Sequence, residues 1–244
     1  MKTPEKTPVD RISQALRPQG KNAGVQEWRN LLFLHWPIAV DVMRSLVPKE
    51  LELDLFDGKA WVGLVPFRMQ GIRPRWLPEA FAFNFLECNV RTYVLHKGEP
   101  GVYFFSLDAS SFLAVWAARL GWALPYYYGE IKESMPDSQI RYQVNRSKRA
   151  KLDVRYRVGQ ALGVSEPGTM EHFFLERYLL FTRRRGQILR GQVYHSAYPV
   201  YTAEVLELSD SLLTVSGLDV GGEPPALIHW SPGVDVEVFS LESE

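Results

Sequence analysis

The sequence predicts a mainly β (α+β) fold, with a single closed or partly closed antiparallel β-barrel-like domain and a few flanking helices. Short stretches with strand character follow one another along most of the 244 residues, and helical periodicity is limited to a few places. Turn residues separate these stretches, for example at Asp57-Gly58 and at 183–186. Closure of the sheet is expected because it removes exposed strand edges.

The composition narrows the range of partners. Lysine plus arginine and aspartate plus glutamate both number 28, so net charge gives no general attraction to nucleic acid or anionic membranes. No apolar run approaches the ~18–20 residues that span a bilayer. The N-terminus lacks the apolar stretch of a secretory signal. We therefore expect a cytoplasmic protein that binds neither nucleic acid nor membrane, and homo-oligomer formation stays open.

The first elements are predicted from apolar runs and prolines. Residues 1–25 are polar and carry prolines and glycines, so we expect a mobile N-terminal lead before a single domain over 26–241. Apolar stretches predict strands at 28–36 and 60–67, with an extended segment at 48–55. Pro37 suits the first turn of a helix over 37–46. The arginine-rich stretch 68–78 is expected to be a loop, because Pro74 and Pro78 interrupt it.

Residues 83–108 are expected to form the central hairpin, with a Gly/Pro turn at 96–101. Alternate side chains of a strand face opposite ways. One side of the first strand is therefore apolar: Leu86, Cys88, Val90 and Val94. The other side carries Phe85, Glu87, Asn89, Arg91 and Tyr93. Two interpretations of this polar row stay open: a solvated sheet face, or the wall of an internal pocket. In both, Glu87 and Arg91 lie roughly 13 Å apart along the strand and cannot pair directly.

The rest of the chain predicts two more helices and several hairpins. Asp108 is a good N-cap for a helix at 109–120 that Gly121 would end, and another helix is expected at 167–177. Three consecutive tyrosines suit a strand at 124–130, with Tyr126 and Tyr128 facing one way and Tyr127 the other. Further strands are expected at 139–145, 150–157, 178–182, 187–195, 199–208, 211–218, 227–230 and 234–239.

Several common reaction classes lack their motifs. The sequence contains no GxGxxG, GxxxxGK[ST], GxSxG or HExxH pattern. The five histidines are scattered, and convergence of these residues in space is the only route to a metal site. Cys88, the single cysteine, lies on the apolar side of its strand, where a thiol is normally inert packing. We therefore expect neither a metal nor a cofactor.

Eight stretches carry a family resemblance, in the order LLFLHWPI, LDLFDGKAWVGLVPFRM, IRPRWLP, ECNVRTYV, PGVYFFSLDA, ARLGWALPYY, EHFFLERY and HWSPGVDVEVF. They span roughly residues 28–240. In them the chain resembles the YqjF-like family of uncharacterised bacterial proteins, which is placed in the acetoacetate decarboxylase-like superfamily. The resemblance implies a barrel-like β-domain with a central cavity and flanking helices.

The resemblance to the decarboxylases themselves is local, and it implies the candidate site. Their Y-x-E strand looks like Leu86-Glu87, which matches Glu87 to the acidic residue near their catalytic lysine. Arg119 and Pro125 have the separation of the arginine and proline that precede the two lysines of their G-[FY]-P-K-K run. Tyr126 and Tyr127 stand at those lysine positions, and a phenol cannot form a Schiff base with a keto acid.

Two functions therefore stay open. In the first, Glu87 and Tyr126 are catalytic and move protons at a small carbonyl or carboxylate compound in the cavity, without a Schiff-base lysine. Asn89, Arg91, Tyr127 and Arg119 would then bind this small-molecule ligand. In the second, the same residues hold a carboxylate or enol in a non-catalytic binding or interaction protein. The identity of the ligand cannot be predicted from the sequence.

Overall fold

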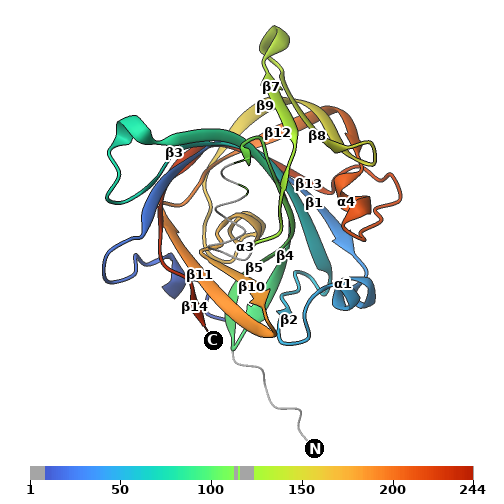
Figure 1. Ribbon diagram of the computed structural model, residues 1–244. Coiled ribbons are helices and arrows are strands. Elements are labelled where there is room, and N and C mark those ends of the chain that lie inside the picture. The colour runs from blue at the N-terminus through green and yellow to red at the C-terminus, as the bar shows by residue number, and fades with distance from the viewer. Residues whose placement is uncertain (1–8, 113–114, 116–123, 244) are drawn as a thin grey trace, which may run out of the picture.

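The computed structural model describes residues 9–112, 115 and 124–243. Within these residues the protein is mostly β, and its strands belong to one 14-stranded sheet (Figure 1). The longer strands are β1 (Gly24–Ile38), β3 (Ala60–Pro74), β4 (Phe83–His96), β5 (Glu99–Ala109), β8 (Ile140–Ser147), β9 (Ala150–Val164), β10 (Leu179–Arg184), β11 (Gln187–His195), β12 (Pro199–Asp210) and β13 (Leu227–Val238). The shorter strands are β2 (Glu52–Leu53), β6 (Tyr126–Tyr128), β7 (Glu130–Ser134) and β14 (Glu242–Ser243). The described helices are α1 (Val40–Leu46), α3 (Met170–Leu175) and α4 (Leu212–Val215), with 3₁₀ turns η1 (Ser13–Ala15), η2 (Glu79–Phe81) and η3 (Pro136–Ser138).

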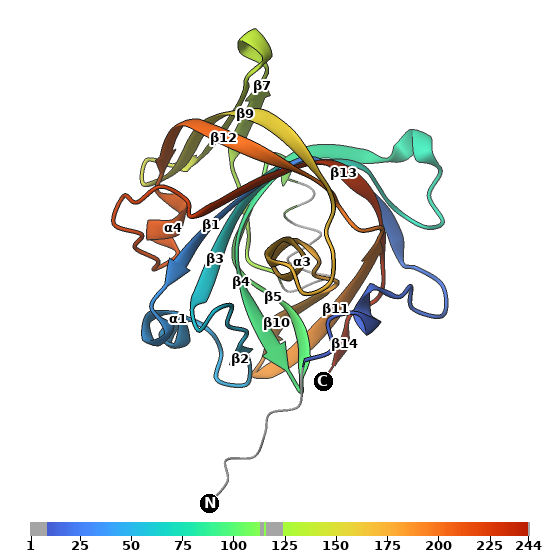
Figure 2. The same cartoon turned by 180° about the vertical axis from the view of Figure 1, so that it is seen from behind.

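The strand pairings return to their starting point. Beginning at β11, they run through β10, β5, β4, β3, β1 and β13, and β13 pairs with β11 again. All of these pairs are antiparallel except β10 with β5. The sheet continues from β13 through β12, β9, β8 and β7, on one side of this ring of strands (Figure 2). The interior of the ring and its outer face therefore pack against different parts of the chain.

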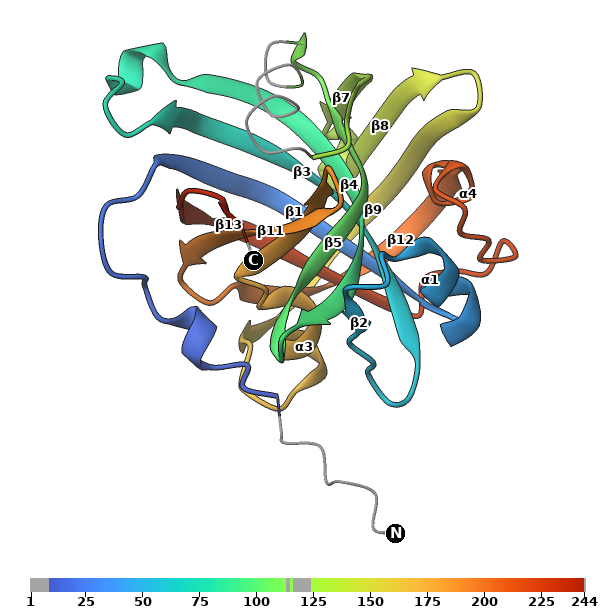
Figure 3. The ribbon, with the colours of Figure 1, turned by 60° about the horizontal axis from the view of Figure 1, so that its bottom comes forward.

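Alternate residues of the ring strands belong to two separate cores. On β1, Leu32 and Leu34 pack in an outer core with side chains of β8 and β9, whereas Leu31 and Phe33 point into an inner core. On β4, the predicted apolar side packs outward in the same way, because Cys88 and Val90 are fully buried in the outer core. Helices α1 and α4 cover one end of this outer core and lie side by side (Figure 3).

Helix α3 lies inside the ring of strands and fills one end of it (Figures 1 and 2). The hydroxyl of Thr169 accepts a hydrogen bond from the backbone N–H of His172 and so caps the start of the helix. Phe174 of the helix is fully buried and packs against the rings of His35 and Tyr93. The inner core therefore consists of α3 together with the inward side chains of the surrounding strands.

The described residues before β1 are tied to the rest of the protein at two places. The guanidinium of Arg11 makes two hydrogen bonds, each 2.6 Å long, to the carboxylate of Asp54. Arg17 pairs with Glu237 of β13. At Gly233 the chain passes so close to β1 that a Cβ atom would lie 1.9 Å from the carbonyl oxygen of Trp28, so this position requires glycine.

Three predicted elements differ from the structure. Residues 68–74 continue β3 instead of forming a loop, and in Figure 3 the β3–β4 hairpin extends beyond the rest of the sheet. A strand was expected at 211–218, but the carboxylate of Asp210 accepts hydrogen bonds from the N–H groups of Leu212 and Leu213 and starts α4 there. Asp108 lies in β5 and is not a helix N-cap, because it forms a buried ion pair with Arg146.

Two of the predicted helices begin later than expected. Pro37 still belongs to β1, and α1 starts at Val40. Helix α3 occupies 170–175 of the predicted 167–177. Most of the predicted helix 109–120 lies outside the described residues. None of the helices in the described part of the chain is both long and apolar enough to cross a membrane.

Candidate functional site

The ring of strands encloses a cavity of about 670 Å³. Its wall is largely apolar and includes Trp28, Phe67, Met69, Phe85 and Phe104. Charged side chains enter it at four places, namely Arg73, Glu87, Arg91 and Arg177. A concave apolar pocket with a few convergent polar groups is the usual form of a small-molecule site.

The polar row of β4 lies on the wall of this cavity. Glu87, Asn89 and Arg91 are 2%, 5% and 9% exposed, and all three line the cavity. Of the two interpretations of this strand, the internal pocket describes the structure and the solvated face does not. No ion pair joins Glu87 to Arg91 within the described part of the chain, in keeping with their spacing along the strand.

Glu87 and Tyr126 form a buried acid–phenol pair. Strand β6 runs parallel to β5 and pairs Tyr126 with Leu107, while Glu87 of β4 pairs with Ala109 on the other side of β5. The two side chains meet across β5, where the Tyr126 hydroxyl donates a 2.7 Å hydrogen bond to Oε2 of Glu87. This pairing fixes the position of the carboxylate on the cavity wall.

The pKa of Glu87 is raised from 4.5 to about 7, chiefly because the carboxyl group is buried. Hydrogen bonds from Tyr126 and Asn89 oppose this rise, and the charge of Asp108 adds to it. The pKa of Tyr126 lies well above 10 because of burial and the neighbouring Glu87 charge. Near neutral pH, Tyr126 is therefore a neutral donor and Glu87 can exist in either protonation state.

Two arginines, Arg91 and Arg177, line the inner end of the cavity near α3. Nη2 of Arg91 donates a hydrogen bond to the carbonyl oxygen of Phe174. Arg177, which follows α3, donates to the carbonyl of Phe173 and pairs with Asp54 at 2.7 Å. Both guanidinium groups lie over the ring of Tyr93, at 5.8 Å for Arg91 and 4.9 Å for Arg177.

Sequence reasoning missed Arg177. It is separated from β4 by more than 80 residues and falls at the end of a predicted helix, where a cation is ordinary. Burial lowers its pKa to about 10, so it remains protonated at neutral pH. In the motif EHFFLERY, Glu176 separates Arg177 from the apolar residues before it, and no local pattern indicates that this arginine reaches a cavity.

Of the other two predicted ligand-binding residues, Tyr127 is not brought to the cavity. Tyr127 is 38% exposed and is not among the described residues that line the cavity. The guanidinium of Arg146 lies over its ring at 4.3 Å, on the side of β6 opposite Tyr126. Arg119 lies outside the described residues.

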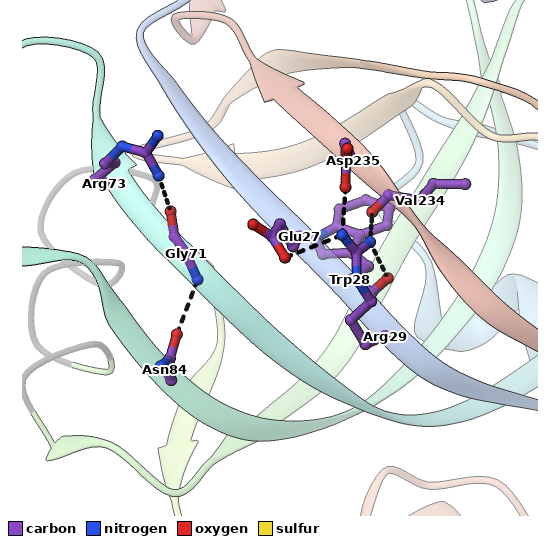
Figure 4. A network of polar contacts seen from close by, with 8 residues as sticks. All are labelled: Glu27, Trp28, Arg29, Gly71, Arg73, Asn84, Val234 and Asp235. Atoms are coloured by element: carbon purple, nitrogen blue, oxygen red, sulfur yellow. Dashed lines mark hydrogen bonds and ion pairs between the residues drawn. The ribbon is translucent and has the colours of Figure 1, made fainter. Parts of the chain in front are cut away.

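A polar network supports the strands beside the cavity mouth (Figure 4). Arg29 of β1 donates to the carbonyl of Val234 on β13 and pairs with Asp235. On the neighbouring hairpin, the N–H of Gly71 donates to Asn84, and Arg73 donates to the carbonyl of Gly71. These contacts join β1 to β13 and β3 to β4 beside the cavity.

The described part of the chain contains neither a metal-binding cluster nor a buried lysine. No group of three or more His, Cys, Asp or Glu side chains in it could hold a metal ion. Each of its lysines is exposed to solvent. Only Lys2 and Lys6 lie outside the described residues.

Solved structures with a similar fold belong to the acetoacetate decarboxylase-like group. The enduracididine biosynthesis enzyme MppR complexed with pyruvate matches with a TM-score of 0.65 at 10% identity, over 92% of this chain and 91% of that one. Acetoacetate decarboxylase from Legionella pneumophila matches with a TM-score of 0.65 at 13% identity, over 93% and 91% of the two chains. At these identities the likeness concerns the fold.

Sequence comparison gives a nearer relative. The chain is 36% identical over 219 residues to the uncharacterized protein YqjF of Bacillus subtilis (strain 168). The aligned region covers 88% of this chain and 90% of that protein. The family model DUF2071, described as an uncharacterized conserved protein, matches residues 25–235. The chain therefore belongs to the DUF2071 family of YqjF-like proteins, whose fold is that of the acetoacetate decarboxylase-like proteins.

Proposed function

We propose that this protein is an enzyme that moves a proton on a small carbonyl or carboxylate compound, inside a barrel formed by the ring of strands. The observation that carries the proposal is the buried Glu87–Tyr126 pair on the cavity wall, in which Glu87 has a pKa of about 7. A general base works best when its pKa lies near the operating pH. The MppR complex with pyruvate supports a carbonyl acid as ligand for this fold.

In the proposed mechanism, the Glu87 carboxylate removes a proton from the carbon next to the carbonyl group of the ligand. The electron pair of that C–H bond moves onto the carbonyl oxygen and gives an enolate. Glu87, now protonated, returns the proton to the same or a neighbouring carbon. Tyr126 holds the carboxylate in position through its hydrogen bond, and Asn89 supports the ionised form. Isomerases, hydratases and cyclases share this proton transfer.

The mechanism uses no Schiff-base lysine. Tyr126 lines the cavity at a position where the resemblance would put a lysine, and every lysine of the described residues is exposed. Borohydride reduction in the presence of acetoacetate should therefore leave the intact mass of the protein unchanged. A stable adduct on any lysine would contradict this part of the proposal.

Deuterium exchange tests the proton transfer without knowledge of the natural substrate. The protein is incubated in D₂O with a panel of 2-oxo acids and ketones, and loss of the proton next to the carbonyl is followed by NMR. We expect faster exchange with the wild-type protein, rising with pH through about 7 as Glu87 ionises. Glu87→Gln should abolish the acceleration and keep ligand binding.

A non-catalytic binding protein is the second candidate. It is favoured by Arg91 and Arg177 at the inner end of the cavity, which can hold a carboxylate without any chemistry. In that case the wild-type protein would bind panel members without accelerating exchange, and Glu87→Gln would change little. The same experiment therefore separates the two functions.

A further inference from the structure

The cavity face of β4 changes from apolar and exposed at one end to polar and buried at the other. Phe83 is 50% exposed and Phe85 is half-buried, whereas Glu87, Asn89 and Arg91 are all buried. The eight residue steps from Phe83 to Arg91 cover roughly 26 Å at ~3.3 Å per residue. The cavity therefore opens to solvent near Phe83, and its polar groups lie deeper inside.

Neighbouring strands repeat this order, because their register aligns apolar residues at the same depth. Phe83 pairs with Ile72, and Phe85 pairs with Met69, which in turn pairs with Trp28 of β1. All five of these side chains line the cavity. The outer half of the cavity is thus lined mainly by apolar and aromatic side chains on β4, β3 and β1, with Arg73 of β3 beside them.

The inner end has hydrogen-bonding groups without protein partners. Within the described part of the chain, Nε of Arg91, Nη2 of Arg177 and Oδ1 of Asn89 are buried and lack a hydrogen-bond partner. Leaving such groups unpaired costs free energy, so a bound ligand is a natural partner for them. Two guanidinium donors beside one aromatic ring suit a carboxylate in particular, since arginine binds carboxylates through charge-assisted hydrogen bonds.

We propose that the substrate is a 2-oxo acid with an aromatic or branched apolar side chain. This inference rests on the proposed function, because it uses Glu87 and Tyr126 to place the reacting carbon. The carboxylate binds Arg91 and Arg177, the carbonyl and its neighbouring carbon lie beside Glu87, and the apolar side chain extends toward Phe85 and Phe83. Specificity then comes from the apolar outer half of the cavity.

The volume of the cavity agrees with a ligand of this size. At about 670 Å³ it falls within the ~300–1,000 Å³ of pockets that hold drug-sized ligands. A bare keto acid such as pyruvate would leave the aromatic outer half unfilled. An apolar side chain would fill it and remove its surface from water, which is favourable.

Binding of three matched probes to the Glu87→Gln protein tests the substrate class independently of turnover. Phenylpyruvate has an aromatic ring and a carboxylate, pyruvate lacks the ring, and phenylacetone lacks the carboxylate. By calorimetry, we expect phenylpyruvate to bind roughly 10 to 100 times more tightly than pyruvate, as expected for burial of an aromatic side chain. Phenylpyruvate should bind at least about tenfold more tightly than phenylacetone, because phenylacetone has no carboxylate to accept hydrogen bonds from Arg91 and Arg177.

Cavity variants locate the two ends of the ligand. Phe85→Ala should weaken phenylpyruvate binding several-fold and leave pyruvate binding unchanged. Phe81→Ala is the matched control, since Phe81 lies on the same hairpin, is 65% exposed and is not among the described residues that line the cavity. Arg91→Met should weaken binding of both acids without affecting phenylacetone.

The outcomes separate the two proposals. Equal affinity for phenylpyruvate and pyruvate, equal affinity for phenylpyruvate and phenylacetone, or no binding of any probe would overturn the inference on substrate class. Tight binding of phenylpyruvate without deuterium exchange by the wild-type protein would support the substrate class and refute the proposed catalysis.

Discussion

Glu87 is subject to opposing effects, and the size of each can be judged from its surroundings. Burial favours the neutral carboxyl group, whereas the hydrogen bonds from Tyr126 and Asn89 favour the carboxylate. The desolvation effect is larger, so the pKa rises from 4.5 to about 7. Arg91, which could have reversed this result, is occupied at Phe174 instead. The spacing of the two residues along β4 is therefore what allows Glu87 to titrate near neutrality.

The raised pKa predicts a pH-dependent stability that Glu87→Gln removes. Below pH 4.5 the group is protonated in both the folded and the unfolded chain, so it carries no penalty. Between pH 4.5 and about 7 the unfolded chain releases the proton and the folded chain keeps it, so stability falls as pH rises. The shift corresponds to roughly 3 kcal/mol at about 1.4 kcal/mol per pKa unit.

Urea unfolding at pH 5 and pH 8 measures this effect. Wild type should lose stability relative to Glu87→Gln by roughly 3 kcal/mol over the whole titration, and most of that loss should appear by pH 8. Because every other group titrates equally in both proteins, the difference between them isolates Glu87. A difference that is the same at both pH values would mean that the pKa of Glu87 is not raised.

Strand β4 belongs to two cores at once, and this predicts separate effects for adjacent residues. Val90 is fully buried in the outer core, and Asn89 faces the cavity. Val90→Ala should cost roughly 2 kcal/mol of stability, since it leaves a void in a packed core, and should leave the pKa of Glu87 unchanged. Asn89→Ala removes a hydrogen bond that lowers this pKa, so the pKa should rise further above 7.

Titration of Glu87 by NMR in both variants, together with urea unfolding, checks this division. Leu64→Ala on β3 is a further control, because Leu64 pairs with Val90 and packs in the same outer core. It should resemble Val90→Ala. If Val90→Ala shifted the pKa of Glu87 as much as Asn89→Ala does, the two faces of β4 would not be independent.

The same strand explains what the sequence could predict. Period-two alternation separates Cys88 and Val90 from Glu87 and Asn89 without any knowledge of the fold, so the two faces of β4 were predictable. Which of the two faces lines a cavity depends on how the strands pair into a ring. That ring includes pairings between distant parts of the chain, such as β11 with β13 and β1 with β13. Arg177 reaches the cavity only because α3 lies inside that ring, which no local pattern in 167–177 indicates.

In two segments, hydrogen bonding produced a different element from the one that composition predicted. The stretch 211–218 has strand composition, but the carboxylate of Asp210 binds two backbone N–H groups and starts a helical turn. The prolines in 68–78 suggested a loop, yet β3 continues to Pro74, where its pairing with β1 ends at Gly24. Both cases depend on a hydrogen-bond partner that composition does not specify.

At the scale of the whole molecule, Asp54 joins three distant segments at the end of the ring that holds α3. Its carboxylate pairs with Arg11 from the segment before β1 and with Arg177 from the segment after α3. Its backbone N–H also donates to the carbonyl of Tyr93 on β4. Asp54 and Arg177 are both nearly inaccessible to solvent, whereas the side chain of Arg11 is 25% exposed. The two ion pairs of Asp54 should therefore differ in their effect on stability.

Asp54→Asn should destabilise the protein by roughly 3–5 kcal/mol, because it leaves the buried guanidinium of Arg177 without its counter-charge. Arg11→Ala should cost only about 1 kcal/mol, since a partly exposed pair is screened by solvent and Asp54 keeps Arg177 as its partner. Urea unfolding of both variants at neutral pH provides the comparison. Arg177 lines the cavity, and Asp54→Asn removes the negative charge beside it, so this variant should bind a carboxylate probe more tightly, whereas Arg11→Ala should not. Equal destabilisation by the two substitutions would mean that the buried pair does not hold α3 to the ring.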